Sequence, residues 1–195
     1  MTTSDAELVQ QALAGSQAAC HDLVGRYATP AVNLATRLVR DHAVAEELAQ
    51  EAFKRAFQRL STYDQQLRFA SWFFQILHNV TIDYLRRKRP PTVSLEEWEE
   101  LGYPGMEPAS AETAPDVLAE QAAVARAVDA ALYLIRPEYR EAVVLRYHED
   151  LSVQEIAEIM AVPAGTVKTY LFRARKELAS ILSARGWIPA RTGAG

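Results

Sequence analysis

The sequence of 195 residues has few of the features that mark secreted, membrane-spanning or metal-binding proteins. Its one cysteine, Cys20, excludes an internal disulfide and a cysteine-cluster metal site, and the Ala-rich helical pattern around it favours a small buried hydrophobe. No apolar run approaches the ~20 residues of a membrane span, and the polar N-terminus has no signal-peptide core. We therefore expect a cytoplasmic protein.

Motifs for catalysis are missing as well. The sequence has no Gly-rich phosphate loop, no HExxH motif and no nucleophile elbow. His21 and His42 lie apart without a ligand-spaced partner, so solvated or capping roles fit them better than metal binding. We expect no enzymatic activity, no catalytic residue, no metal and no cofactor.

Charge is unevenly distributed along the chain. The formal net charge is −4, but residues 1–90 hold 11 Lys/Arg against 9 Asp/Glu, and residues 119–195 hold 10 against 9. Residues 91–118 hold 7 acids and no base. Because the acid excess belongs to the middle segment alone, the overall balance does not argue against a nucleic-acid partner.

The most informative stretch, residues 151–178, reads LSVQEIAEIMAVPAGTVKTYLFRARKEL. Ser152 and Glu155 predict a capping box at the start of one helix, and Pro163 fits the first turn of a second helix. The predicted buried face of the second helix consists of Val167, Leu171 and Ala174. An ordinary helical hairpin with a basic solvated face is the alternative, but the capping box, the small residue in the turn and the basic second helix together favour a DNA-binding helix-turn-helix.

Two helical stretches open the chain. Residues 4–40 have a helical pattern that is punctuated by Gly15 and Pro30. Residues 41–60 predict an amphipathic helix, capped by Asp41, with acids in its early turns and bases in its last. From the residues alone, a solvated outer face is the preferred interpretation of this helix.

The stretch 69–89, FASWFFQILHNVTIDYLRRKR, holds more aromatic residues than a helix of this length should need for its core. Four consecutive bases end it, and two prolines follow. Aromatic rings beside a basic cluster suit single-stranded nucleic acid, because bases stack on the rings while cations follow the backbone. An aromatic core with a basic C-terminal cap is an equally good reading.

The segment 91–118 is rich in Pro, Gly, Ser and acids, lacks periodicity, and predicts a flexible linker. Its acids are either simply solvated, which the residues favour slightly, or mimic nucleic-acid phosphate in a basic channel. Beyond it, helices are predicted from Leu118 and from Pro137, and the helix-turn-helix packs against them. A flexible linker also permits the two halves of the free protein to pack together.

Taken in order, these stretches resemble a bacterial RNA polymerase sigma factor of the extracytoplasmic-function (ECF) group. AEELAQEAFKRAF resembles the polymerase-docking helix of that family, SWFFQILHNVTIDYLRRKR its promoter-melting helix, and RPEYREAVVLRYHEDLSVQEIAEIMAVPAGTVKTYLFRARKEL its C-terminal helix-turn-helix domain. The resemblance covers nearly everything from Ala6 to Leu182. It implies an all-α fold of two small helical domains, sigma region 2 at residues 1–90 and sigma region 4 at 119–183, joined by the acidic linker 91–118 and followed by a tail at 184–195.

The resemblance also implies the function and the partners. Such a protein binds core RNA polymerase, through the β′ coiled coil and the β flap, and directs it to particular promoters. Its C-terminal domain recognises duplex −35 DNA, its N-terminal domain captures melted −10 DNA, and an anti-sigma factor holds it inactive. The linker would thread towards the RNA exit path, which favours phosphate mimicry. The alternatives are a stand-alone helix-turn-helix regulator and a protein that only sequesters polymerase.

Individual residues take their implied roles from the same resemblance. The residues at the polymerase coiled coil are Glu47, Gln50, Glu51, Phe53 and Lys54. The residues at the −10 element are Tyr63, Asp64, Arg68, Phe69, Trp72, Phe73, Asn79, Arg86, Arg87, Lys88 and Arg89. The residues at the −35 element are Thr166, Lys168, Thr169, Tyr170, Arg173 and Arg175.

Two places depart from the family pattern. The loop before the melting helix reads TYDQQLR, without the Arg-Gly pair that the family often has. The recognition helix reads GTVKTY where the family often reads GTVRSR. Lys168 in place of Arg loses bidentate guanine recognition, and Tyr170 replaces a cation with an aromatic ring. The promoter sequence of the family is therefore not transferred to this chain.

Overall fold

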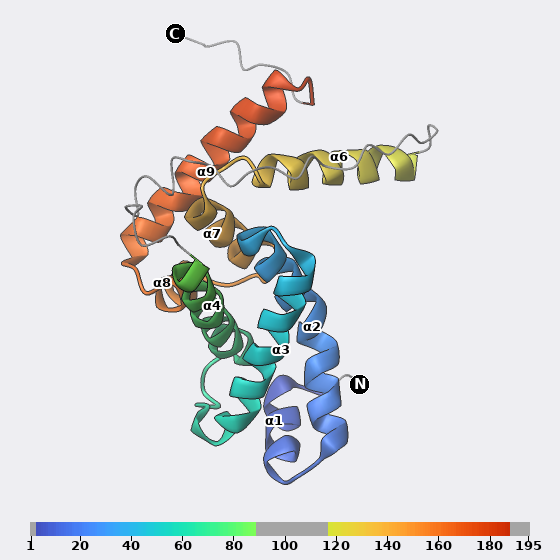
Figure 1. Ribbon diagram of the computed structural model, residues 1–195, viewed down its shortest axis with the longest axis vertical. Helices are drawn as coiled ribbons and strands as arrows, with labels where there is room; N and C mark the ends of the chain where they lie inside the picture. The colour runs from blue at the N-terminus through green and yellow to red at the C-terminus, as the bar shows by residue number, and fades with distance from the viewer. Residues whose placement is uncertain (1–2, 89–116, 188–195) are drawn as a thin grey trace.

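The computed structural model describes residues 3–88 and 117–187, and within these it describes the side-chain surroundings of 3–88 and 123–187. The described residues form helices and no strand, which confirms the all-α prediction (Figure 1). None of these helices is both long and apolar enough to cross a lipid bilayer. In chain order they are α1 Asp5–Leu13, α2 Gln17–Val39, α3 His42–Gln58, the 3-10 turn η1 Leu60–Thr62, α4 Phe69–Lys88, α6 Val117–Leu132, α7 Pro137–Tyr147, α8 Val153–Met160 and α9 Ala164–Ala184.

Side-chain caps set the starts of the first three helices of the N-terminal half, which comprises α1 to α4. Ser4, Ser16 and Asp41 each accept a hydrogen bond from a backbone N–H of the first turn that follows. Gly15 makes the turn between α1 and α2 at φ 91°, a conformation that costs glycine little. Pro30 lies inside α2 rather than ending it, because the helix is held along its length by packing on α3 and α4.

A buried arginine closes the C-terminal end of α6. Arg140 is 1% exposed, and it donates from Nε to the carbonyl of Leu132 at 2.7 Å and from Nη2 to the carbonyl of Ile135 at 2.9 Å. It also donates to the carbonyls of Tyr133, at 3.1 Å, and of Arg37 in α2. The last carbonyls of a helix lack partners within the helix, and one guanidinium carries five N–H groups to satisfy them. Arg140 therefore joins the C-terminal half, α6 to α9, to the N-terminal half.

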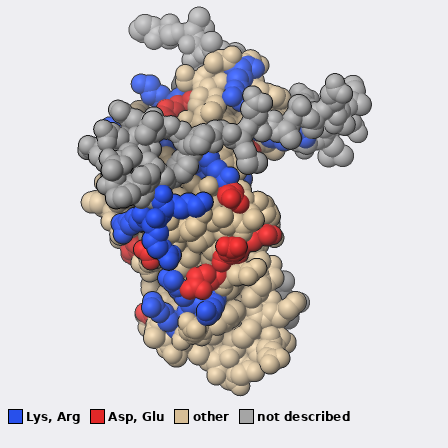
Figure 2. Space-filling model, in the orientation of Figure 1, with Lys and Arg blue, Asp and Glu red and all other residues tan. Residues whose placement is uncertain are grey.

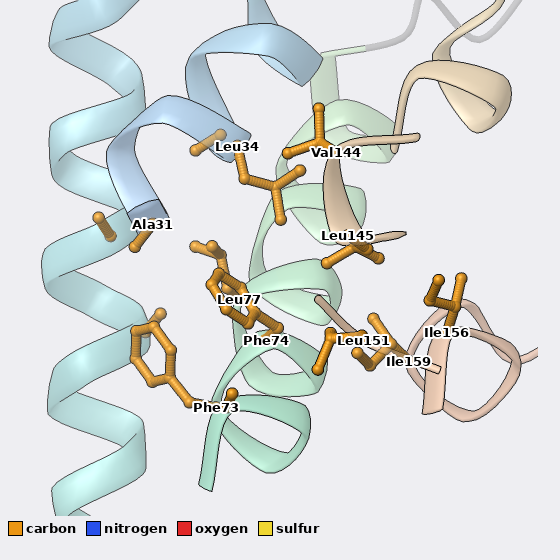
Figure 3. Close-up of a cluster of buried hydrophobic side chains, with 14 of the residues drawn as sticks. Ala31, Leu34, Phe73, Phe74, Leu77, Val144, Leu145, Leu151, Ile156 and Ile159 are labelled. Atoms are coloured by element: carbon orange, nitrogen blue, oxygen red, sulfur yellow. The ribbon is translucent and has the colours of Figure 1, made fainter. Parts of the chain in front are cut away.

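The two halves pack against each other around one continuous core. Helix α4 contacts α8, and α2 contacts α7. Figure 3 shows Leu77 of α4, Leu145 of α7 and Leu151 of the loop that follows in one cluster of buried side chains, and all three are 0% exposed. Burying a leucine contributes roughly 1.5–3 kcal/mol, so a few such contacts hold the halves together. A flexible linker permits the two halves to pack together, and in the structure they do so.

Candidate nucleic-acid interface

Helices α8 and α9 form the predicted helix-turn-helix. The Ser152 hydroxyl accepts from the N–H of Glu155 at 3.2 Å, and the Glu155 carboxylate accepts from the N–H of Ser152 at 2.7 Å, which confirms the capping box. Beyond α8, Ala161 adopts a left-handed conformation at φ 53°, and the N–H of Val162 returns to the carbonyl of Ala157 at 3.0 Å. This C-terminal cap turns the chain tightly into α9.

Helix α9 buries one face and leaves its cations outside. The predicted buried face is confirmed, with exposed fractions of 0%, 7% and 0% at Val167, Leu171 and Ala174. Of the residues expected at the −35 element, Thr166 and Tyr170 are half-buried, and the exposed ones are Lys168, Thr169, Arg173 and Arg175. Two of these make bonds within the helix, from the Thr169 hydroxyl to the carbonyl of Gly165 at 3.0 Å and from Arg175 Nε to the carbonyl of Leu171 at 3.3 Å. An exposed helix face rich in donors has the form that enters a major groove.

Most of the aromatic side chains near the start of α4 lie in the core. Fewer of them are therefore exposed for stacking on bases than the sequence suggested. Phe69 and Phe73 are 2% and 0% exposed, and the ring centroid of Phe73 lies 4.5 Å from that of Phe53 in α3. Tyr63 is buried as well. Trp72 is half-buried, with its ring centroid 5.2 Å from Tyr63 and 5.7 Å from Phe69. In this conformation the buried rings support Trp72, the partly exposed member of the group.

The polar residues before α4 are tied to neighbouring backbone. The Asp64 carboxylate accepts from the N–H of Gln66 at 2.9 Å, and both residues are exposed. Arg68 donates from Nη1 to the carbonyl of Asp150, in the C-terminal half, at 2.8 Å, and lies 3.9 Å from the Glu155 carboxylate. One of the cations expected at the −10 element is thus in contact with the helix-turn-helix half.

The far end of α4 carries the basic cluster. Asn79 is exposed on this helix, and the exposed residues of its last turn are Arg86, Arg87 and Lys88. Lys88 Nζ lies 5.2 Å from the ring centroid of Tyr84, whereas Arg89 lies outside the described residues. Figure 2 shows Lys and Arg side chains gathered on this side of the molecule, beside a line of acidic side chains over α3. The predicted cationic surface therefore exists at the end of the aromatic helix.

The outer face of α3 is polar. Its exposed residues among those expected at the polymerase are Glu47, Gln50 and Lys54. Glu51 accepts from Arg55 Nε at 2.8 Å, and this hydrogen bond lowers the pKa of the Glu51 carboxyl. Phe53 points inward at 9% exposure. Although acids gather on α3, the described part of the chain has no cluster of three His, Cys, Asp or Glu that could hold a metal ion.

Polar contacts between the halves were missed from the sequence. His78 Nδ1 of α4 lies 2.6 Å from Glu141 Oε1 of α7, with the side chains 12% and 3% exposed. Burial alone would lower the pKa of His78, but the hydrogen bond and the charge of Glu141 outweigh burial and the repulsion from Arg86, so this pKa is raised. The partners are 63 residues apart, and only the tertiary fold brings them together.

Two further bonds cover the same side of α4. The Ser71 hydroxyl donates to the Glu155 carboxylate, and Gln75 Nε2 donates to the carbonyl of Glu158 at 3.2 Å. Burial raises the pKa of Glu155, but its hydrogen bonds with Ser71 and Ser152 outweigh burial, and the net shift is downward. Ser71, Gln75 and His78 recur at helical spacing, so the C-terminal half occupies one whole stripe of α4.

Comparison with known protein families matches both halves of the chain. The Sigma-70 region 2 family model matches residues 23–90, which include α3 and α4. The Sigma-70, region 4 family model matches residues 125–178, which include the helix-turn-helix.

Curated relatives match over nearly their whole length. The ECF RNA polymerase sigma factor SigW of Bacillus subtilis is 34% identical over 174 residues, which cover 87% of this chain and 92% of that protein. The ECF RNA polymerase sigma-E factor of Escherichia coli K12 is 29% identical over 177 residues, which cover 90% and 92%.

Two solved structures share the fold. CnrH in complex with the cytosolic domain of CnrY matches with a TM-score of 0.64 and 24% identity, over 93% of this chain and 99% of that chain. The sigma factor RpoE in complex with the anti-sigma factor NepR from Bartonella quintana matches with a TM-score of 0.60 and 21% identity, over 83% and 97%.

Proposed function

This chain belongs to the ECF sigma factors of bacterial RNA polymerase, and we propose how its surfaces divide the work of promoter recognition. A sigma factor binds core polymerase and directs initiation to particular promoters. The match to region 2 argues against a stand-alone regulator, because residues 23–90 then belong to a polymerase-binding domain. We assign the chain no catalytic step, since promoter opening follows from tighter binding to single-stranded than to duplex DNA.

Helix α9 recognises the −35 duplex. The observation that carries this role is the basic face of α9, which stays exposed while Val167, Leu171 and Ala174 are buried. We assign direct base or phosphate contacts to the residues on that face and at its edges, namely Thr166, Lys168, Thr169, Tyr170, Arg173 and Arg175. Phosphate contacts position such a helix, and base-edge contacts supply the sequence preference.

Helix α4 and the loop before it capture the melted −10 strand. Trp72 is the stacking surface, because it is the partly exposed ring of its group, and Asn79 offers an amide for a base edge. Unstacking a base costs a few kcal/mol, which the pocket contacts must offset. We assign Asp64 and Arg68, which precede α4, to contacts with the captured strand, and the basic end of the helix, Arg86 to Arg89, to its phosphates. Tyr63, Phe69 and Phe73 act from within the core by holding Trp72 in position.

The outer face of α3 docks on the β′ coiled coil of the polymerase. Glu47, Gln50, Glu51 and Lys54 form this face, and Phe53 anchors the helix from inside. We assign the β flap to the C-terminal domain at residues 119–183, and the RNA exit path to the acidic segment 91–118, whose seven acids would mimic nucleic-acid phosphate.

The packed arrangement of the halves is an inactive form. Arg68 is tied to the C-terminal half by its hydrogen bond to the carbonyl of Asp150, and α8 packs on α4, the helix that we assign to the −10 strand. Polymerase binding separates the halves, and an anti-sigma factor keeps them together. The similarity to RpoE supports the proposal of an anti-sigma partner, because that sigma factor was solved with an anti-sigma factor bound.

Run-off transcription tests the proposal. Purified core polymerase is incubated with a pool of genomic promoter fragments, with and without this protein. We expect new, discrete transcripts that return both promoter elements at once. Absence of transcripts, together with specific duplex binding by the protein alone, would favour the stand-alone regulator instead.

A matched pair of variants assigns the −35 role. Arg173→Ala should weaken binding to the −35 duplex and leave capture of a single-stranded −10 oligonucleotide intact. Arg185→Ala removes another exposed cation, just beyond α9, and should change neither. If Arg173→Ala also reduces oligonucleotide capture, the division of work between the halves is wrong.

A further inference from the structure

Helix α7, which carries none of the residues assigned to DNA, supports the recognition helix from behind. Tyr139 of α7 is 3% exposed, so its ring and its hydroxyl are held by the core. Arg173 of α9 donates from Nη1 to the Tyr139 hydroxyl at 3.2 Å. The ring of Tyr170, also on α9, packs on the ring of Tyr139 with 5.4 Å between centroids and 46° between planes. One buried tyrosine thus contacts two of the six residues assigned to the −35 element.

The two contacted residues share one face of α9. Tyr170 and Arg173 are three apart, and residues at that spacing are neighbours on a helix surface. Arg173 is exposed apart from this bond, and a guanidinium carries five N–H donors, so the bond to Tyr139 leaves other donors for DNA. A long arginine side chain loses rotamer freedom when it binds, and a side chain that is already held loses less.

We propose that Tyr139 is a positioning residue for −35 recognition: its buried hydroxyl holds the Arg173 guanidinium, and its ring holds Tyr170, in the orientation that meets the major groove. The inference rests on the proposed role of α9 at the −35 element. Tyr139 itself does not touch DNA. It acts through Arg173 and Tyr170, so it contributes to the DNA specificity of the domain as well as to its hydrophobic core.

The test removes one oxygen atom. Tyr139→Phe keeps the ring, and Tyr147→Phe makes the same change on the same helix at a side chain that is 60% exposed. Holoenzymes assembled from core polymerase and each full-length variant are titrated with a labelled duplex that carries the −35 sequence returned by run-off transcription. We expect Tyr139→Phe to weaken binding about 3- to 10-fold, the effect of one hydrogen bond, and Tyr147→Phe to have no effect. Thermal unfolding of each variant verifies that it folds.

A double-mutant cycle separates positioning from a merely structural role. In an Arg173→Ala background, Tyr139→Phe should have almost no further effect, because the group that the hydroxyl positions is gone. An equal loss in both backgrounds would show that Tyr139 supports only the fold, and would overturn the inference. Unchanged or tighter binding by Tyr139→Phe alone would overturn it as well. Failure of the sigma-factor proposal is a different result, because the unaltered protein then directs no transcription.

Discussion

Replacing His78 with alanine should destabilise the packed arrangement of the two halves. His78 and Glu141 form a buried pair at 2.6 Å across the boundary between α4 and α7. The variant leaves the Glu141 carboxylate, at 3% exposure, without its partner. Removing one member of a buried ion pair costs about 3–5 kcal/mol, because the remaining charge is neither hydrated nor paired.

Thermal unfolding of the full-length chain measures this cost. A loss of 1 kcal/mol lowers the midpoint by roughly 2–4 °C in a chain of this size, so we expect His78→Ala to unfold about 6–20 °C lower. If the halves separate before they unfold, Glu141 becomes hydrated, and the loss appears as an expanded form in small-angle scattering. Either readout reports the same lost contact.

The effect has a definite pH dependence. The pKa of His78 is raised above its ordinary value of 6.5, so the protonated form favours the packed state. This contribution is complete below the ordinary pKa and disappears as pH rises through the raised pKa. The difference in midpoint between the unaltered chain and His78→Ala should therefore be larger at about pH 6 than at about pH 8.5.

The exposed pair of His42 and Glu46 supplies the control. Its atoms lie 3.7 Å apart, and its side chains are 68% and 54% exposed. Such surface pairs contribute little, so His42→Ala should leave the midpoint almost unchanged at both pH values. Equal midpoints for the His78 and His42 variants, with no expanded form of the His78 variant in small-angle scattering, would refute the claim that burial makes the pair between the halves important.

Three further predictions concern other parts of the molecule. Trp72→Ala should lower promoter opening roughly 5- to 150-fold in run-off assays, the effect of one lost base stack, while core binding in a gel-shift assay is kept. Arg140→Met leaves several buried carbonyls without a donor and should cost about 3 kcal/mol or more of unfolding free energy in urea titrations. Ser152→Ala removes the capping hydroxyl of α8 and should cost about 1 kcal/mol in the same titrations.

Each of these predictions has its own counter-result. Equal loss of promoter opening and core binding would reject the stacking role of Trp72. Arg185→Ala, at an exposed cation, is the control for Arg140→Met, and a similar cost in both would deny the importance of the buried bonds. Ser180→Ala is the control for Ser152→Ala, because Ser180 is exposed inside α9 and caps nothing.

The local features of this protein could be predicted from its sequence. The capping box of α8, the N-cap at Asp41 and the buried stripe of α9 depend on residues within one or two helical turns of each other, so spacing alone identifies them. The family resemblance was equally accessible, because its motifs are contiguous and lie in order along the chain, and both family models confirm it.

Long-range features were decided by the tertiary structure. From the sequence, the aromatics of α4 fitted a stacking surface and an aromatic core equally well. Phe69 and Phe73 lie in the core, where Tyr63 packs on Phe69 and Phe53 of α3 packs on Phe73. The sequence gives no sign that His78 meets Glu141. Such contacts depend on how two helices face each other, and their partners are separated by dozens of residues that carry no local signal.

The sequence by itself therefore determined the set of helices, the helix-turn-helix and the membership in the ECF sigma factors. The tertiary structure decided which of the expected DNA-binding rings are buried, that the two halves pack together, and that Tyr139 lies under the recognition helix. The physical reason is one of range. Caps and amphipathic stripes are built from neighbours along the chain, whereas burial and pairing depend on neighbours in space.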